Sequence, residues 1–79
     1  MCADITDKQL EALKILTAII EGRDRQKFKA YTREFVACFE GLQTEQCRKA
    51  LEVLAVMGRV GDIDNAPKVL SYFKRHLHK

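Results

Sequence analysis

The sequence predicts a single, mainly α-helical domain with a short β-ribbon near its C-terminus. Apolar residues recur at three- and four-residue spacing over much of 10–57, which is the period of an amphipathic helix. Val, Tyr and Phe flank a Pro-containing turn within 59–73, a pattern typical of two paired strands. The 79 residues suffice for one small domain only, so 1–79 is treated as a single unit.

The first predicted helix begins at Thr6 and ends at Gly22. Thr6 and Gln9 match the capping-box pattern, in which two side chains satisfy free N–H groups at a helix start. Apolar residues follow at helical spacing up to Gly22: Leu10, Leu13, Leu16 and Ile20. We expect this helix to be a packing element, and Ile15 and Ile19 widen its apolar face enough for a subunit contact.

The stretch 23–29 is the most polar part of the chain and is predicted to be a loop. It carries an excess of basic side chains, Arg23, Arg25, Lys27 and Lys29, and Arg33 follows shortly after it. Residues 28–31 are predicted to form a short edge strand, and Thr32 to cap the next helix. Two interpretations of these basic side chains stay open: they are solvated, or they lie along a DNA phosphate backbone.

Residues 33–58 are predicted to form a helix, a tight turn and a second helix. Ala37 is small enough to let the two helices cross closely. Gly41 stands past the end of the first helix, where the left-handed backbone that favours glycine is needed. Thr44 is expected to cap the second helix, 45–57. The buried face of that helix carries three regularly spaced residues: Cys47, Leu51 and Leu54.

The opposite face of helix 45–57 is polar and is the part of the chain that a partner can reach. The side chains expected to contact DNA here are Gln43, Thr44, Gln46, Arg48 and Lys49. An amide can pair with an adenine edge, and a cationic side chain can take guanine or a phosphate. The basic residues Arg25, Lys27, Lys29 and Arg33 are expected to add phosphate contacts. The alternative is a merely solvated face, since Glu45 and Glu52 reduce its positive potential.

The run 33–58 resembles the helix-turn-helix of DNA-binding repressors and activators. The resemblance is carried by Ala37, Gly41, Leu42, Cys47, Ala50 and Leu51. The continuation A-V-M-G-R-V-G is similar to the end of the recognition helix in the winged-helix subclass. The resemblance implies a winged helix-turn-helix fold, with a β-wing at 59–73 followed by a basic tail at 74–79.

The C-terminal segment has a second interpretation. Asn65 would cap a final helix and Pro67 would lie in its first turn, which makes an all-α helix-turn-helix bundle. One face of that helix would carry Leu70, Phe73 and Leu77. The wing is preferred because Tyr and Phe follow a Pro turn, although Asp62 and Asp64 count against its touching DNA.

Composition excludes several classes of function. No run of apolar residues is long enough to cross a bilayer, and the N-terminus lacks the pattern of a secretory signal, so we expect a cytoplasmic protein and no membrane partner. The three cysteines, Cys2, Cys38 and Cys47, form no C-x-x-C pair and are expected to be reduced thiols. His76 and His78 lack a third ligand nearby, so no metal is expected. No catalytic motif or cofactor motif is present, which argues against an enzyme.

The leading hypothesis is a small sequence-specific DNA-binding protein. It would be a transcriptional regulator of the bacterial or phage type that reads the major groove of double-stranded DNA with helix 45–57. We expect a homodimer, because one module contacts too little DNA, and no small-molecule effector, because no sensor domain remains. The alternatives are a protein–protein interaction module on a winged-helix scaffold and a phage- or plasmid-encoded inhibitor of a host protein. A continuous positive face favours DNA, and a broken one favours a protein partner.

Overall fold

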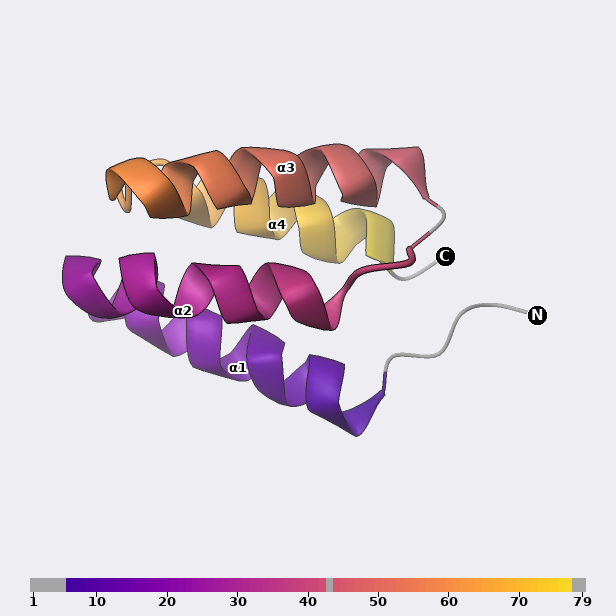
Figure 1. The fold of residues 1–79 in the computed structure, drawn as a ribbon, viewed down its shortest axis with the longest axis horizontal. Helices are drawn as coiled ribbons and strands as arrows, with labels where there is room; N and C mark the ends of the chain where they lie inside the picture. The colour runs from indigo at the N-terminus through magenta and orange to yellow at the C-terminus, as the bar shows by residue number, and fades with distance from the viewer. Residues whose placement is uncertain (1–5, 43, 78–79) are drawn as a thin grey trace.

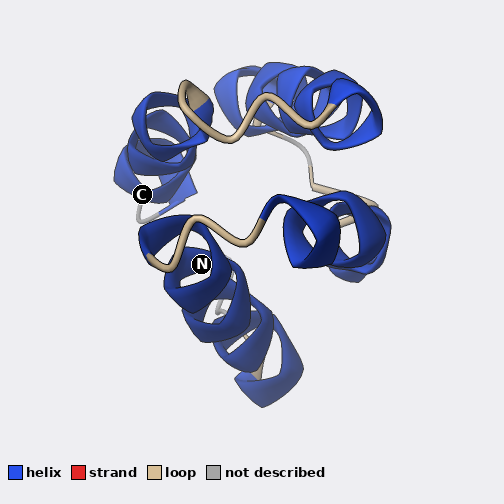
Figure 2. Cartoon of the chain, turned by 90° about the vertical axis from the view of Figure 1, so that its left-hand side faces the viewer, coloured by secondary structure: helices blue, strands red, loops and turns tan. Residues whose placement is uncertain are grey.

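The computed structural model describes residues 6–42 and 44–77, and within these segments the chain forms four helices and no strand (Figure 1). The helices are α1, Asp7–Glu21; α2, Arg25–Cys38; α3, Glu45–Val60; and α4, Ala66–Leu77. Consecutive helices run antiparallel and side by side, while α1 slants away from the other three (Figure 2). The predicted winged helix-turn-helix is therefore wrong, and the all-α alternative with a C-terminal helix fits.

The first helix was predicted correctly. The hydroxyl oxygen of Thr6 accepts a hydrogen bond from the Gln9 backbone N–H, and the Gln9 side chain accepts one from the Thr6 N–H, both at 3.1 Å. Gly22 is the C-cap, as expected. Gln9 also donates from Nε2 to the carbonyl of Cys38 at 2.9 Å, which satisfies an acceptor at the end of α2 and ties the two helices together.

The loop at 23–29 and the edge strand at 28–31 were predicted wrongly, because both segments belong mostly to α2. Asp24 begins that helix by accepting a hydrogen bond from the Lys27 backbone N–H at 3.1 Å. Phe28, Thr32 and Phe35 are spaced by four and three residues, so a helix buries all three on one face. Thr32 is consequently no cap; its buried hydroxyl donates to the Phe28 carbonyl.

The turn between α2 and α3 matches the expectation in part. Gly41 has a φ of +94°, the left-handed conformation predicted for it. Thr44 occupies the N-cap position of α3, but its side chain makes no capping hydrogen bond. Ala37 is exposed and does not lie at a helix crossing. The helices run alongside each other in Figure 1, whereas those of a DNA-binding helix-turn-helix cross steeply.

The β-wing predicted for 59–73 is replaced by the end of α3, a short turn and most of α4. Gly61 ends α3 with a φ of +79°, and the Asp62 carboxylate accepts hydrogen bonds from both the backbone and the side chain of Asn65 before α4 begins. A strand would place Leu70 and Phe73 on opposite faces, whereas a helix buries both on one face. That shared burial is why the helix forms.

Aromatic rings form the centre of the core. Phe35, Phe39 and Phe73 contact one another with ring centroids 4.9 to 5.8 Å apart. Cys47, Leu51 and Leu54 are buried beside them, as predicted. Burial raises the pKa of the Cys47 thiol above its ordinary value.

The basic tail predicted for 74–79 belongs largely to α4. Lys74, Arg75 and His76 lie in the last turn of that helix, where positive charge suits the negative end of the helix dipole. Residues 78–79 and Cys2 lie outside the described segments. Over 6–42 and 44–77, no helix combines the length and the hydropathy that crossing a membrane requires.

Candidate nucleic-acid interface

The predicted reading residues of α3 are exposed but do not share one face. Gln43 lies outside the described segments, and Thr44 is half-buried. Because successive helix residues turn by about 100°, Gln46 and Arg48 are related by a rotation of about 200° and point to nearly opposite sides of α3. Lys49 lies within 3.8 Å of the Glu45 carboxylate, which offsets its charge. These side chains therefore cannot enter one DNA groove together.

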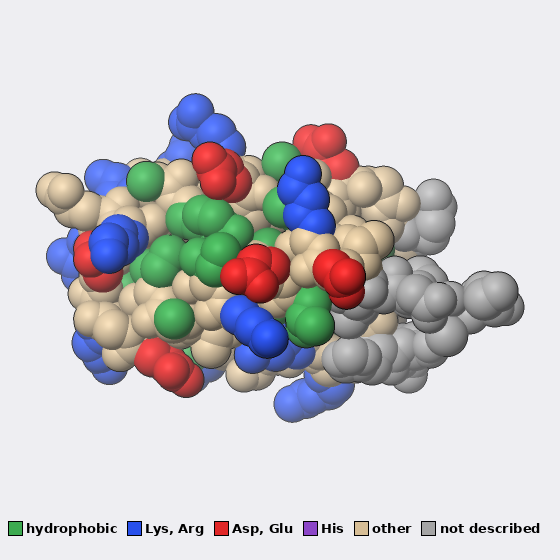
Figure 3. Space-filling model, turned by 90° about the horizontal axis from the view of Figure 1, so that it is seen from below, with side chains coloured by type: hydrophobic (Ala, Val, Ile, Leu, Met, Phe, Trp, Pro, Cys, Tyr) green, Lys and Arg blue, Asp and Glu red, His purple; other side chains and the backbone are tan. Residues whose placement is uncertain are grey.

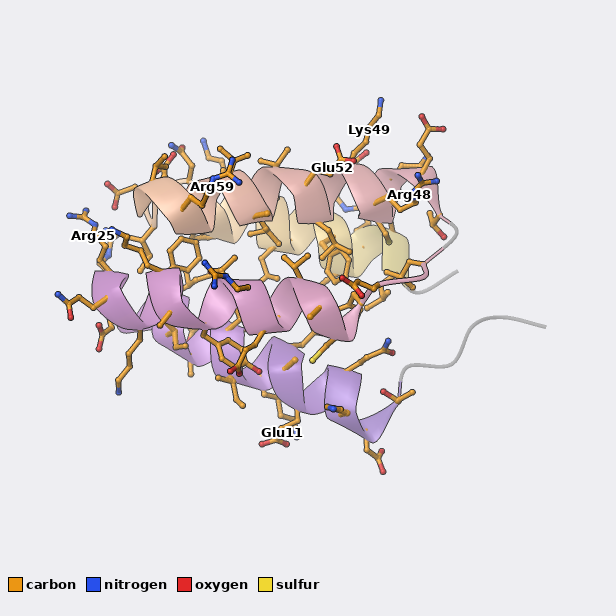
Figure 4. The ribbon with its side chains drawn as sticks, in the orientation of Figure 1. Glu11, Arg25, Arg48, Lys49, Glu52 and Arg59 are labelled. Atoms are coloured by element: carbon orange, nitrogen blue, oxygen red, sulfur yellow. The ribbon has the colours of Figure 1, made fainter. Side chains whose placement is uncertain are left out.

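The outermost face of α3 offers few hydrogen-bond donors. Val53 and Val56 are 44% and 48% exposed on it, and the carboxylates of Glu45 and Glu52 are exposed beside them. Figure 4 shows Lys49 and Glu52 pointing away from the bundle on this side. A face of valines and carboxylates is poorly suited to contacting base edges or phosphates.

The predicted basic residues of α2 divide between two sides of that helix. Lys27 faces the α1 side, where it helps to line a hollow, and its ammonium lies 4.0 Å from the Asp24 carboxylate. Lys29 and Arg33 face α3 instead and line a groove between the two helices. Arg25 lies at the same end, since its side chain and that of Lys29 extend beside Gly61.

We call this depression the cationic groove. It has a volume of about 480 Å³ and runs between α2 and α3. Its lining residues are Lys29, Thr32, Arg33, Val36, Ala37, Glu40, Ala55, Gly58 and Arg59. Figure 4 shows Arg25 and Arg59 at one end of the helix pair and Arg48 toward the other end of α3.

Small side chains explain why the groove exists. A Cβ atom on Gly58 would lie 2.6 Å from the Cβ of Thr32, so the absence of a side chain at Gly58 lets α2 and α3 approach closely there. Ala37 and Ala55 line the groove with a methyl group each. The helices are thus held close while the space above the contact stays open.

The charge beside the groove is strongly unbalanced. Three cations line the groove, Lys29, Arg33 and Arg59, and the Arg25 side chain lies beside that of Lys29 near Gly61; we call these four the groove cations. None of them forms an ion pair with a residue of the described segments, whereas Arg23, Lys27 and Lys49 each lie within ion-pair distance of a carboxylate. Glu40 is the only acidic residue that lines the groove in the described chain. An anion would therefore meet little competition for these cations.

Arg59 is the groove residue that the sequence analysis missed. It was assigned to a strand of the wing, although it follows Arg48, Glu52 and Ala55 at the four- and three-residue spacing of one helix flank. That spacing is the signal that could have identified it. The expected continuous positive face from 25–29 to Arg48 and Lys49 is broken, because Lys27 and Lys49 lie on other sides of their helices, and this break counts in favour of a protein partner. A smaller positive patch remains, since Lys29, Arg33 and Arg59 line one groove.

A second surface feature lies between α1 and α2. A hollow of about 260 Å³ is lined by Ile19, Lys27, Ala30, Tyr31 and Glu34, and Figure 3 shows hydrophobic side chains gathered on this face beside acidic ones. We call it the α1–α2 hollow. Burial, and then the nearby Cys38, Glu34 and Glu11, raise the pKa of the Tyr31 hydroxyl. The hollow is therefore an apolar surface edged by both signs of charge, with Lys27 and Glu34 in its lining and Glu11 close to Tyr31.

Comparison of the chain with protein-family models, with curated proteins and with solved structures found no match.

Proposed function

We propose that this protein binds double-stranded DNA through its phosphates, and that the cationic groove is the contact surface. The observation that supports this most strongly is the set of groove cations, three of which line one depression while Arg25 lies beside Lys29, with no ion-pair partner in the described chain. A surface of this kind attracts a polyanion and is poorly matched to a neutral or cationic ligand.

Arginine and lysine supply complementary contacts to phosphate. The guanidinium groups of Arg33 and Arg59 come from facing helices and can each donate two parallel hydrogen bonds to phosphate oxygens. Lys29 adds a compact charge from α2. Because the floor between them is made of small residues, a phosphate can approach all three without displacing a bulky side chain.

The same geometry favours contacts to the backbone over reading of bases. The reading residues proposed on α3 point in different directions, and the outer face of that helix carries Val53, Val56 and Glu52. Phosphate contacts carry little sequence information. The interaction is therefore expected to be weakly specific, with a dissociation constant of roughly 1 to 100 μM at physiological salt.

A duplex fits the groove better than a single strand does. Proteins that bind single strands stack the bases on exposed aromatic rings. The residues that line the groove are charged, aliphatic or small, and the exposed Tyr72 belongs to α4, which packs on the other flank of α3. The phosphate spacing of a duplex, rather than stacking, would set the affinity.

The direct test is fluorescence anisotropy with a labelled duplex at several salt concentrations. Because four cations can neutralise about four phosphates, we expect log K to fall against log salt with a slope of about −3 to −4. The variant Lys29→Ala/Arg33→Ala/Arg59→Ala should reduce the steepness of that slope by about three. A matched control removes three exposed cations from other faces: Lys8→Ala, Lys14→Ala and Lys68→Ala.

Two results would contradict the proposal. One is a wild-type protein that does not bind the duplex at low salt. The other is an equal loss of affinity in the groove variant and the control variant, which would mean that only net charge matters. Circular dichroism should first show that both variants keep the helical content of the wild type.

A second candidate function is an interaction with a basic protein segment, and the α1–α2 hollow favours it. Ile19, Ala30 and Tyr31 offer an apolar surface, with Glu34 in the lining and Glu11 near Tyr31. Lys27 also lines the hollow, but its ammonium lies 4.0 Å from the Asp24 carboxylate, which offsets its charge. A synthetic helical peptide of leucine and lysine is a suitable probe for calorimetry. Binding that is lost in Glu11→Lys/Glu34→Lys, in a protein that does not bind the duplex, would favour this function over DNA binding.

A further inference from the structure

The outer face of α3 carries an apolar stripe that the bundle leaves uncovered. Of the six large apolar side chains exposed in the described chain, Val53, Val56 and Val60 lie on this helix and Tyr72 lies beside them on α4. Their exposed fractions are 44%, 48%, 68% and 42%, in that order. Val53 and Tyr72 also line a shared hollow of about 310 Å³. We call these four residues the valine stripe.

The spacing of the stripe is that of a helix-pairing seam. Lys49, Val53, Val56 and Val60 are separated by four, three and four residues, the repeat that keeps one face of a helix against another helix. β-Branched valines suit such a seam, because they pack into the holes of a partner helix with little rotamer freedom to lose. The stripe is therefore shaped to receive a helix.

We propose that the helix it receives is α3 of a second copy of this chain, running antiparallel about a two-fold axis. Val53 then packs against Val56 of the partner subunit, and the reverse contact follows from the symmetry. At each end, the aliphatic part of Lys49 covers Val60 of the partner subunit. The contact is self-complementary, as a two-fold interface requires.

Charges beside the stripe select the second copy and its direction. Glu52 and Arg59 lie two turns apart, both on the side of the valine stripe nearer to α2, and neither forms an ion pair with another described residue. An antiparallel pairing centred between Val53 and Val56 brings Glu52 within reach of Arg59 of the partner subunit, twice over. A parallel pairing would instead place Lys49 against Lys49 on the seam, which is repulsive, and would put Glu52 and Arg59 of one subunit on the opposite side of the seam from those of the other, so that this ion pair could not form.

The antiparallel arrangement has a consequence for the cationic groove, and this consequence alone rests on the proposed function. In Figure 1, α2 and α3 are the helices nearer the viewer, with α3 above α2, and the groove runs between these two helices. A two-fold axis along the line of sight turns the second subunit upside down in this view, but the side of each subunit that faces the viewer stays the same. Both grooves of the dimer therefore face the same side, where one duplex can contact Lys29 and Arg33 of both subunits, while Arg59 is paired with Glu52 of the partner subunit.

The interface is centred on one helix per subunit and is small by the standard of permanent dimers, so association should depend on concentration. Sedimentation velocity of the full chain without DNA, over about two decades of concentration in the micromolar range, should show a monomer–dimer equilibrium. Val56→Glu should raise the dissociation constant at least about tenfold. Ile15→Glu, an equivalent change to an exposed β-branched residue on α1, should leave it unchanged.

Charge exchange tests the direction of pairing. Glu52→Arg and Arg59→Glu should each weaken the dimer, while the double variant should restore it, because both ion pairs re-form with their charges exchanged. A chain that stays monomeric at every concentration overturns the proposal. A dimer that tolerates Val56→Glu, or that the double variant does not restore, overturns it as well. Since no DNA is present, none of these results depends on the proposed function.

Discussion

The two flanks of α3 pack against their neighbours in opposite ways. Toward α4, the contact is made by large side chains, with Phe73 fully buried and its carbonyl 3.9 Å from the Cys47 thiol. Toward α2, it is made by Thr32 and Gly58, and the space above is left open as the cationic groove. The difference shows that side-chain size at the contact decides whether a helix pair forms core or forms a cleft.

The largest effect is expected on the α4 flank. Phe73→Ala removes a ring that contacts both Phe35 and Phe39, so it should lower the free energy of unfolding by about 3 to 5 kcal/mol. Urea unfolding followed by circular dichroism measures this change. Tyr72→Ala, at the exposed neighbouring position, is the control and should cost about 1 kcal/mol or less. Equal losses in the two variants would mean that α4 does not complete the core.

A smaller effect is expected on the α2 flank. Gly58→Val forces α2 and α3 apart, because even its Cβ would lie 2.6 Å from the Cβ of Thr32, and it should cost about 1 to 3 kcal/mol. Ala55→Val, nearly one turn earlier in the groove lining, should be close to neutral in thermal unfolding. If Gly58→Val were as stable as Ala55→Val, the claim that α2 and α3 lie in close contact at Gly58 would be contradicted.

The buried thiol on the α4 flank should make stability depend on alkaline pH. Burial holds the pKa of Cys47 above its ordinary value, so the unfolded chain loses this proton first as the pH rises beyond about 8.5. The stabilisation from the neutral thiol is therefore complete below that pH and is lost as the pH approaches the folded pKa. Unfolding of the wild type and of Cys47→Ala, measured from neutral to alkaline pH, should converge or cross. Parallel curves would contradict this.

The smallest effect is expected at the residues that the sequence ranked highest for DNA contact. Arg48→Ala/Lys49→Ala should reduce the steepness of the salt dependence of duplex binding by less than about one, because Lys49 already lies beside Glu45 and both lie away from the groove cations. Its melting temperature should match that of the wild type. If this variant reduced the steepness as much as the groove triple variant does, the binding surface would include Arg48 and Lys49 of α3, as the sequence predicted.

Local signals were sufficient for much of the fold. The capping box at Thr6, the stop at Gly22 and the left-handed Gly41 each depend on the chemistry of a few neighbouring residues. The buried face of α3 follows from periodicity, which the sequence displays directly at Leu51 and Leu54. These features could be predicted because they need no knowledge of what packs against them.

The errors arose where tertiary packing decides the outcome. The segment 59–73 has strand-like composition, yet Leu70 and Phe73 are both buried on one face, and Phe73 contacts the rings of Phe35 and Phe39. Two residues three positions apart share a face in a helix but not in a strand. Likewise, Arg25 and Lys29 are polar enough for a loop, but Phe28 between them is fully buried and draws the segment into α2. Polarity alone did not distinguish an exposed helix face from a loop.

The candidate site was predicted in composition but not in arrangement. Arg25, Lys29 and Arg33 were predicted as DNA contacts, and the structure places them as exposed residues of α2, of which Lys29 and Arg33 line the groove. Arg59 was missed because it was assigned to a strand of the wing. Which cations share a groove depends on how α2 and α3 lie against each other. That packing follows from Gly58 and Thr32, which no functional motif marks.

Nuclear magnetic resonance titration of the labelled protein with a duplex tests the central claim most directly, because it locates the contact residue by residue. Binding at the cationic groove should shift the amide signals of 29–37 and 55–61 most strongly, with smaller changes along α1. Shifts concentrated at 45–53 instead, with 29–37 unaffected, would contradict the account.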